Sequence, residues 1–292
     1  MRLEAIALPL VHLALTEDLG GGDVTTDAVV DPSTPALAHI ESRADGVLAG
    51  GPVAALAFRE LDPKASLAWH VQDGGAFTKG TRLCDIRATA RAILSAERVA
   101  LNFLQHLSGI ATQTRAFVKA VEGTGVTILD TRKTTPGLRL LEKFAVLAGG
   151  GMNHRYGLFD TILIKENHIR AAGGLAEAVK RARAPQSGLP VIVEARTEAE
   201  AADAAALGVD RILLDNFTPP GVARVVKKLG ADRAGAKGPA IEVSGGLRLS
   251  NVREFALPGV SFLSVGALTH SAPAVDLSLL MDAVGSEVTK GA

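Results

Sequence analysis

The second half of the chain repeats one pattern, in which a short apolar run is followed by an Ala-rich segment with helical spacing. The runs are VTILD, TILIK, VIVEA, RILLD, AIEVS and FLSVG. Short apolar runs that alternate with helices are typical of parallel strands joined by right-handed crossovers, in a sheet that is open or closed into a barrel. We therefore predict a parallel α/β domain for this half of the chain.

Charged residues, hydroxyls or glycines stand at the carboxyl end of each run. In order they are Asp130 with Thr131, Arg132 and Lys133, then Lys165, Glu194, Asp215, Ser244 with Gly245 and Gly246, and finally Gly266. The carboxyl ends of parallel strands lie on one face of an α/β fold, where ligands bind. A single such residue is usually a solvated loop residue or a helix cap, and Asp215 or Asn216 could cap the helix predicted by DNFTPPG. The whole series indicates a shared pocket.

Two glycine-containing turns follow the last two predicted strands, in EVSGGL (242–247) and SVGALTHS (264–271). Glycine lets backbone N–H groups approach an anion closely, and a following helix N-terminus adds a favourable dipole. Turns after the last two strands of a parallel barrel are the usual place for a phosphate. The sequence therefore indicates a phosphorylated substrate.

Carboxylates and cations are both predicted at this face. Glu194 and Asp215 could hold sugar hydroxyls, a Mg²⁺ ion or a developing cationic carbon, or they could form plain ion pairs. The cations opposite them are Arg132, Lys133, Arg139, His154, Arg155 and Lys165. So much positive charge would repel itself in an empty site, and we expect substrates with several negative charges. His154 by itself stays open between a general acid, a donor to a carboxylate and a structural residue.

Composition excludes some other classes of function. The 31 Lys and Arg residues balance 31 Asp and Glu residues, so no global field attracts nucleic acid or an anionic membrane. Cys84 is the single cysteine, which excludes an intrachain disulfide and favours a reducing, cytoplasmic compartment. No apolar run approaches the ~18 to 20 residues of a membrane span.

The first part of the chain reads as a mixture of helices and short strands. AIALPLVHLAL (5–15) contains a proline and a histidine and lacks a signal-peptide cleavage site, so we interpret it as the first helix. DGGAFTKGTRLCDI (73–86) predicts a hairpin. Residues 90–123 predict a long helical passage between domains, with a break at Gly109. On that helix Arg98 either snorkels beside Leu94 and Leu101 or reaches into a site across an interface.

These motifs, in order and spacing, resemble the quinolinate phosphoribosyltransferases, which make nicotinate mononucleotide for NAD biosynthesis. The most specific block is DTRKTTPGLRLLEKFAVLAGGGMNHRYGLFDTILIKENHI, from Asp130 to Ile169. The other matching segments are EDLGGGDVTT, ERVALNFLQHLSGIAT, ILLDNF, EVSGGL and SVGALTHS. Together they extend the resemblance over essentially the whole chain.

The resemblance implies an N-terminal α/β sandwich domain at 1–107, with 270–292 packing back on it. It implies an incomplete parallel α/β barrel of about six strands at 108–269. It also implies a homodimer with active sites shared between subunits, with further assembly into hexamers left open. The implied reaction joins quinolinate and phosphoribosyl pyrophosphate, with Mg²⁺ as cofactor, and yields nicotinate mononucleotide, pyrophosphate and CO₂.

The resemblance also implies roles for individual residues. The implied quinolinate pocket is Arg132, His154, Arg155 and Lys165, with Arg98 from the neighbouring subunit. The implied phosphoribosyl pyrophosphate site is Lys133, Thr134, Glu194, Asp215, Ser244, Gly245, Gly246, Val265, Gly266 and Ala267. The implied catalytic residues are Lys133, Lys165, Glu194 and Asp215, and the last two also hold Mg²⁺ through water.

One departure from the family pattern concerns the third barrel strand, where many relatives alternate acids as EVEVE. This chain reads IVEAR, so Ile192, Glu194 and Arg196 share a face and only the central acid is kept. Three other interpretations stay open. They are a paralogue linked to molybdenum transport, which lacks the lysine of ILIKENH, a barrel aldolase with a Schiff base at Lys165, and a non-enzymatic barrel that acts as a scaffold.

Overall fold

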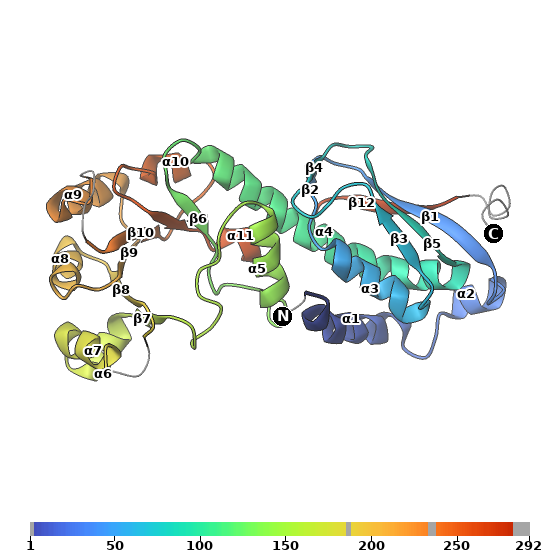
Figure 1. The fold of residues 1–292 in the computed structure, drawn as a ribbon, viewed down its shortest axis with the longest axis horizontal. Helices are drawn as coiled ribbons and strands as arrows, with labels where there is room; N and C mark the ends of the chain where they lie inside the picture. The colour runs from blue at the N-terminus through green and yellow to red at the C-terminus, as the bar shows by residue number, and fades with distance from the viewer. Residues whose placement is uncertain (1–2, 185–187, 233–237, 283–292) are drawn as a thin grey trace. The chain divides into compact units, whose positions relative to one another are not determined.

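The computed structural model describes residues 3–184, 188–232 and 238–282. The chain folds into two compact units (Figure 1). The first consists of the residues up to Gln113, Thr135–Gly150 and the residues from Ser271 onward, and the second of Thr114–Thr134 and Gly151–His270. No helix in the described part of the chain is both long enough and apolar enough to span a membrane.

The first unit is built on an antiparallel sheet in the order β12-β1-β5-β3. Its strands are β1 (Pro35–Ser42), β3 (Ser66–Trp69), β5 (Arg82–Thr89) and β12 (Leu277–Met281). Burial alternates along β1, where every second residue from Ala36 to Ser42 is buried, as expected for a sheet covered on one face only. A two-stranded sheet joins β2 (Gly46–Val47) and β4 (Ala76–Phe77). The unit therefore has the α/β composition predicted for the N-terminal part.

Two predictions for this unit are wrong in detail. Residues 73–86 do not form a hairpin, because β4 pairs with β2 whereas β5 pairs with β1 and β3. The helix α4 (Ala90–Ala120) is continuous through Gly109. A Cβ atom at this glycine would lie 2.1 Å from the carbonyl oxygen of Pro273. Glycine stands there because the returning C-terminal backbone approaches the helix closely, and not because the helix breaks.

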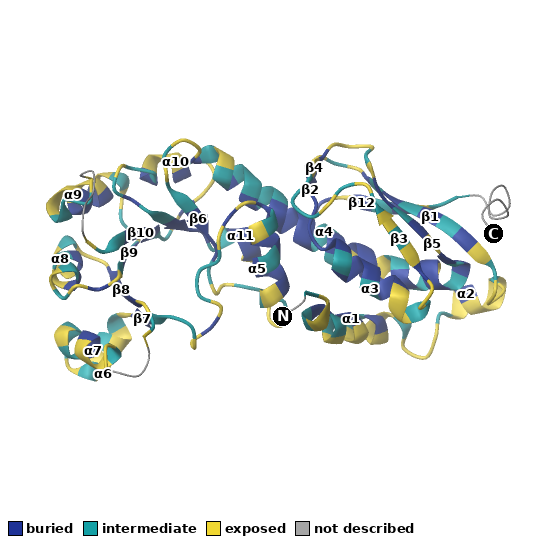
Figure 2. Cartoon of the chain, viewed as in Figure 1, coloured by how far each residue is buried: buried dark blue, intermediate teal, exposed yellow. Residues whose placement is uncertain are grey.

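The remaining helices of the first unit cover its sheet and core. They are α1 (Leu3–Leu19), α2 (Val24–Val29), α3 (Gly51–Leu61) and α5 (Arg139–Ala148). The predicted first helix is present as α1, and Figure 2 shows the buried faces of α3 and α4 in dark blue. The predicted domain limits stay a prediction, since α4 runs without interruption through residue 107. Of the C-terminal segment predicted to pack back, 283–292 lies outside the described residues.

The second unit confirms the predicted incomplete barrel. Its six strands follow the order β6-β11-β10-β9-β8-β7, and every neighbouring pair is parallel. The strands are β6 (Thr127–Leu129), β7 (Ile162–Ile164), β8 (Val191–Ala195), β9 (Arg211–Asp215), β10 (Ala240–Ser244) and β11 (Phe262–Ser264). Within the described ranges β6 and β7 lie at opposite ends of the sheet and do not pair, so the barrel is not closed.

Helices connect these parallel strands or, in the case of α11, follow the last of them. They are α6 (Glu166–Ala172), α7 (Leu175–Ala182), α8 (Glu198–Ala206), α9 (Pro219–Leu229), α10 (Val252–Phe255) and α11 (Ala267–His270). Side chains from the turns cap two of them: Thr197 accepts a hydrogen bond from the backbone N–H of Glu200, and Thr218 accepts one from Gly221. Thr218 thus caps α9 in place of Asp215 or Asn216, which leaves the strand end of β9 available to the cavity described next.

Candidate active site

A cavity of about 580 Å³ opens at the carboxyl ends of the barrel strands. Its lining is mostly polar or charged, although Leu163 and Leu213 contribute apolar surface. Ten of the predicted site residues line it: Arg132, Lys133, His154, Arg155, Lys165, Glu194, Asp215, Ser244, Gly245 and Gly246. The parallel topology thus brings together strand ends that are far apart in the sequence.

Other predicted site residues lie outside this lining. Val265 is 1% exposed, and its N–H donates to the carbonyl oxygen of Leu129. A Cβ atom at Gly266 would lie 3.0 Å from Cδ of Lys133, and the hydroxyl of Thr269 donates to the Lys133 carbonyl at 2.7 Å. The turn after β11 therefore packs against Lys133. Ala267, which begins α11, also lies outside the cavity lining.

Three further predicted residues are placed elsewhere. Thr134 follows Lys133 in the chain but does not belong to the cavity lining. Arg98 and Arg139 belong to the first unit, where Arg98 is exposed on α4 and Arg139 begins α5. The contribution of Arg98 to a neighbouring subunit's site stays a prediction.

Positive charge is crowded on one side of the cavity. Burial lowers the pKa of the Arg155 guanidinium, the nearby charge of Arg132 lowers it further, and Asp160 opposes the shift. Arg155 is oriented by a hydrogen bond from its guanidinium to the carbonyl oxygen of Thr161 at 3.3 Å. Two arginines that repel each other while facing one cavity form a binding surface for an anion with planar oxygen pairs.

The same cavity lining carries the two predicted carboxylates, Glu194 and Asp215. Glu194, which is 8% exposed, forms an ion pair with the ammonium group of Lys165. The guanidinium of Arg196 lies 3.7 Å from Oε1 of Glu194 and 3.9 Å from Oδ2 of Asp215. Arg196 also forms an ion pair with Glu166. The residue that departs from the family pattern therefore lies between the two acids, a position that the sequence alone did not reveal.

The carboxylates can be tested for their fit to Mg²⁺. No group of three or more His, Cys, Asp or Glu side chains within the described ranges could hold a metal ion. Mg²⁺ usually binds to one or two carboxylates and completes its shell with substrate phosphates and water. Glu194 and Asp215, both close to Arg196, supply that number of carboxylates. The donor set fits a Mg²⁺ ion that shares its coordination with a phosphate ligand.

The turn after β10 is locked against the turn after β9. The Asn216 N–H donates to the Ser244 carbonyl oxygen at 2.8 Å, and its side-chain amide donates to Oδ2 of Asp215 at 2.9 Å. Gly245 has a φ of +97°, and a Cβ atom there would lie 2.2 Å from Oδ1 of Asn216. Only glycine fits this position, because the backbone is left-handed and Asn216 fills the space that a Cβ atom would need.

A buried network forms part of the cavity wall, because His154, Glu242 and Ser264 belong to the lining. Glu242 is fully buried in the middle of β10 and accepts hydrogen bonds from the guanidinium of Arg211 at 3.0 Å and from the hydroxyl of Ser264. Nε2 of His154 lies 3.3 Å from Oε1 of Glu242. Burial, the largest single influence, raises the pKa of Glu242, but its contacts with His154, Ser264 and Arg211 together lower it. Sequence reasoning missed Glu242, although an acid inside an apolar strand was a usable signal.

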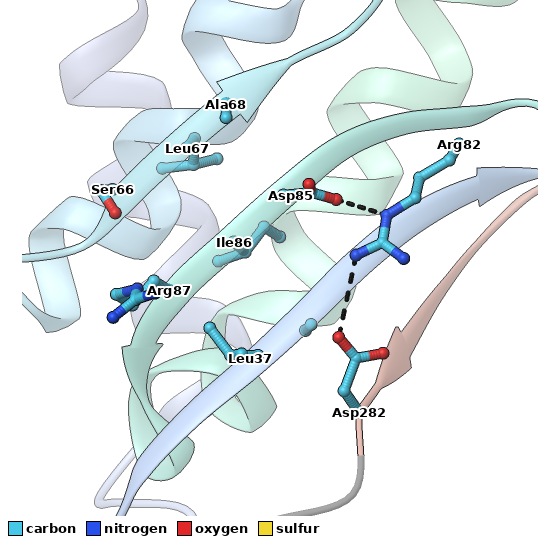
Figure 3. Close-up of a pocket in the computed structure, with 10 residues that line it drawn as sticks. Leu37, Ser66, Leu67, Ala68, Arg82, Asp85, Ile86, Arg87 and Asp282 are labelled. Atoms are coloured by element: carbon cyan, nitrogen blue, oxygen red, sulfur yellow. Dashed lines mark hydrogen bonds and ion pairs between the residues drawn. The ribbon is translucent and has the colours of Figure 1, made fainter. Parts of the chain in front are cut away.

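A second cavity, of about 340 Å³, lies in the first unit on the sheet formed by β1, β3 and β5 (Figure 3). Three of its four charged residues contact one another: Arg82 forms an ion pair with Asp85, and its guanidinium lies 3.7 Å from Oδ2 of Asp282. No crowding of like charge comparable to that around Arg155 distinguishes this cavity. The barrel cavity is therefore the better candidate for an active site.

Comparison with known proteins covers both units. The family description "Quinolinate phosphoribosyl transferase, N-terminal domain" matches residues 23–108, and "Quinolinate phosphoribosyl transferase, C-terminal domain" matches 110–280. A probable nicotinate-nucleotide pyrophosphorylase (carboxylating) of Bacillus subtilis is 42% identical over 271 residues, which cover 92% of this chain and 91% of the relative. The carboxylating nicotinate-nucleotide pyrophosphorylase of Mycobacterium leprae is 43% identical over 274 residues, with 92% and 95% coverage.

The fold is also similar to solved structures. The nicotinate-nucleotide pyrophosphorylase of Francisella tularensis superposes with a TM-score of 0.91 and 38% sequence identity. The match covers 97% of this chain and 98% of that one. Both units therefore have counterparts in one and the same known chain.

Proposed function

The chain belongs to the quinolinate phosphoribosyl transferase family, and we propose that it transfers phosphoribosyl from phosphoribosyl pyrophosphate to quinolinate with decarboxylation. The products are nicotinate mononucleotide, pyrophosphate and CO₂, and the enzyme is a decarboxylating glycosyltransferase of NAD biosynthesis. The observation that carries the proposal is that Arg132 and Arg155 are crowded in one cavity whose lining also contains Glu194 and Asp215. A dianionic ring acid and a polyphosphate sugar have the matching charges.

In this proposal the cationic side binds quinolinate. Arg132 and Arg155 present planar donor pairs to the two ring carboxylates, and Lys165 adds a compact positive charge. Lys165 reaches the ring carboxylate by exchanging its ion pair with Glu194. Binding at fixed points places the ring nitrogen in line with the C1 atom of the sugar, so positioning supplies much of the catalysis.

The transfer step breaks one bond and forms another at C1. The ring nitrogen donates its lone pair to C1, and the C1–O bond electrons leave with pyrophosphate, whose charge Lys133 stabilises. Positive charge develops on the ribose in the transition state, and the carboxylates of Glu194 and Asp215 stabilise it electrostatically. The 5-phosphate lies at the turns of Ser244, Gly245 and Gly246.

Decarboxylation follows from the product of the transfer. Once its nitrogen is alkylated, the ring is cationic. The electron pair left when CO₂ departs stays on the adjacent ring carbon, where the positive charge of the nitrogen stabilises it. A proton from solvent then replaces CO₂ on that carbon. The step needs no organic cofactor, because the cationic nitrogen itself stabilises the carbanion.

Mg²⁺ is the proposed cofactor. Glu194 and Asp215 hold it through water, together with the phosphates of the sugar substrate, and it neutralises charge on the leaving pyrophosphate when bound. The proposal predicts that phosphoribosyl pyrophosphate binds at least about tenfold more tightly with Mg²⁺ than with EDTA, as measured by calorimetry. Equal affinity for phosphoribosyl pyrophosphate with Mg²⁺ and with EDTA would contradict the proposed role of Mg²⁺.

We further propose a cytoplasmic homodimer in which Arg98 completes the partner's quinolinate pocket, with hexamers as a possible higher assembly. The exposure of Arg98 on α4 supports this, because the side chain is accessible to a second copy. Arg98→Ala and Lys165→Ala should each be inactive alone. In an equal, randomly reassociated mixture half of the dimers are heterodimers, and each heterodimer has one intact site of two. The mixture should therefore regain about a quarter of wild-type activity. Failure to complement in verified heterodimers would contradict a shared site.

The central experiment is turnover by the purified chain. With Mg²⁺ and phosphoribosyl pyrophosphate we expect quinolinate to be converted to nicotinate mononucleotide, with release of labelled CO₂ from the ring. Nicotinate, which lacks one of the two carboxylates, should be a poor substrate. Efficient use of nicotinate, or no turnover of either acid, would refute the proposed function.

A further inference from the structure

The buried network in the cavity wall has a directional hydrogen-bonding order. The backbone N–H of Arg155 donates to Nδ1 of His154 at 2.7 Å. Because Nδ1 accepts this hydrogen bond, the proton of the neutral imidazole is on Nε2. Nε2 lies 3.3 Å from the carboxylate of Glu242, which can only accept. Each ring nitrogen of His154 therefore has a protein partner of the complementary kind.

Through His154, the buried Glu242 is connected to the backbone of Arg155, a cationic residue of the site. The side chain of His154 is 8% exposed, and the backbone N–H of His154 donates to Oδ1 of Asp130 at 2.9 Å. The imidazole thus connects the core of β10 with the backbone of Arg155. The guanidinium of Arg155 lies in the cavity lining, so the position of its backbone affects the anion-binding surface directly.

We propose that Glu242 is a positioning residue that holds His154 in its Nε2–H form and, through His154, fixes Arg155 for recognition of the substrate carboxylate. His154 is then a structural link and not the general acid that its presence near the cavity suggests. The inference rests on the proposed function where it names quinolinate as the ligand of Arg155. The proton position on His154 is independent of that function.

An isosteric substitution separates the polarity of Glu242 from its volume. In Glu242→Gln the charged donor of Arg211 attracts the amide oxygen, because Arg211 contacts Oε2 and offers only donors. The amide NH₂ group then faces Nε2 of His154 and needs an acceptor there. The proton moves to Nδ1, where it opposes the N–H of Arg155 and displaces that backbone.

The test combines a spectroscopic and a kinetic measurement. Long-range ¹H–¹⁵N correlation spectra at neutral pH report which imidazole nitrogen carries the proton, and a His154→Asn variant assigns the signal among the seven histidines. We expect the Nε2–H form in the wild type and the Nδ1–H form in Glu242→Gln. The KM for quinolinate should rise roughly tenfold or more, with less change in kcat and in the KM for phosphoribosyl pyrophosphate.

Two further variants complete the design. Ser264→Ala removes a hydrogen bond to the same Oε1 atom without reversing polarity, and it should keep both the Nε2–H form and the wild-type KM within about threefold. Arg211→Met in the Glu242→Gln background frees the amide to turn its oxygen toward His154, and it should restore both readouts.

The outcomes are decisive even if a variant fails to fold. An Nδ1–H form of His154 in the wild-type protein overturns the proposal without reference to any variant. An unchanged KM for quinolinate in a folded Glu242→Gln protein that shows the altered proton position also overturns it. If the wild type has no turnover at all, the proposed function fails, while the spectra still decide the proton position.

Discussion

The two larger sheets of this protein handle charge in different ways. On the open face of the first unit's sheet, Arg82 pairs with Asp85 (Figure 3). Nε2 of His70 lies 3.0 Å from the same carboxylate. In the barrel cavity, Arg132 and Arg155 lie close enough for one to lower the pKa of the other. Paired charges satisfy one another, whereas crowded like charges require a ligand. The crowding, and not the number of charged residues, distinguishes the active site.

The contrast has its origin in the sheet type. The antiparallel strand β5 alternates between buried residues such as Leu83 and exposed ones such as Arg87, so its polar residues face water along the whole strand. The parallel strand β8 is buried at every position. Apart from Glu242 in the middle of β10, the polar residues of the barrel strands that line the cavity stand at or near the strand ends.

The largest expected effect is on kcat/KM, and it comes from comparing Arg155 in the barrel cavity with Arg82 on the first unit's sheet. Arg155→Ala removes a cation that we assign to quinolinate binding and should lower kcat/KM for quinolinate by roughly 10² to 10³-fold. Arg82→Ala removes an equally charged side chain from the paired surface and should change kcat/KM less than about twofold. Steady-state kinetics with varied quinolinate measure both. Similar losses in the two variants would erase the proposed difference between the sheets.

A pair of glycine substitutions separates backbone strain from ligand binding. Gly245 and Gly80 have similar positive φ values, +97° and +84°, but only a Cβ atom at Gly245 would collide with a neighbour. Gly245→Ala should raise the KM for phosphoribosyl pyrophosphate by roughly tenfold or more, because it disturbs the phosphate turn. Gly80→Ala should cost about 1 kcal/mol of stability and leave the KM unchanged. An equal KM for phosphoribosyl pyrophosphate in the two variants would mean that the substrate phosphate does not bind at this turn.

How far the sequence predicts the molecule depends on the range of the interactions involved. Strand periodicity and parallel topology together predict that Arg132, Lys165 and Glu194 meet at one cavity, because the rule is local to each strand end. The hairpin prediction is wrong because β5 pairs with two strands from other parts of the chain, and residues 73–86 alone contain no signal for that choice. The predicted helix break at Gly109 is wrong for the same reason. This glycine is needed because the backbone of Pro273, distant in sequence, packs closely against the helix.

The candidate site shows the same limit. Glu242 was missed because a strand pattern does not reveal which interior acid finds three donors, and its partners come from β9, β11 and a loop. Arg196 was recognised only as a departure from a family pattern, and its position between two carboxylates depends on the relative placement of β8 and β9. Residue type and spacing predict which groups converge, but not which of them contact each other.

Acid should destabilise the barrel through its buried carboxylate. The pKa of Glu242 is lower in the folded protein than its ordinary value of 4.5, so its ionised form contributes stability above that value. The contribution is lost as the pH falls below about 4.5 and through the folded pKa. Urea midpoints of the wild type should fall over this window, and Glu242→Gln should be less stable at neutral pH by about 1 to 3 kcal/mol, with a flatter profile. If the stability of Glu242→Gln fell with pH in parallel with that of the wild type, Glu242 would not be the source of the acid sensitivity.

The smallest effect is expected for the ion pair on the open face. Arg82 and Asp85 are 47% and 42% exposed, so water and salt screen their attraction. A double-mutant cycle with Arg82→Ala and Asp85→Ala should give a coupling free energy of about 0.2 to 1 kcal/mol in urea unfolding, and 1 M salt should reduce it further. The loss of stability caused by Ser264→Ala serves as a control. The hydrogen bond that this variant removes is buried, so the loss should be insensitive to salt. A coupling well above 1 kcal/mol that persists in salt would mean that the first sheet also holds its charges in a site shielded from water, and the comparison between the two sheets would lose its basis.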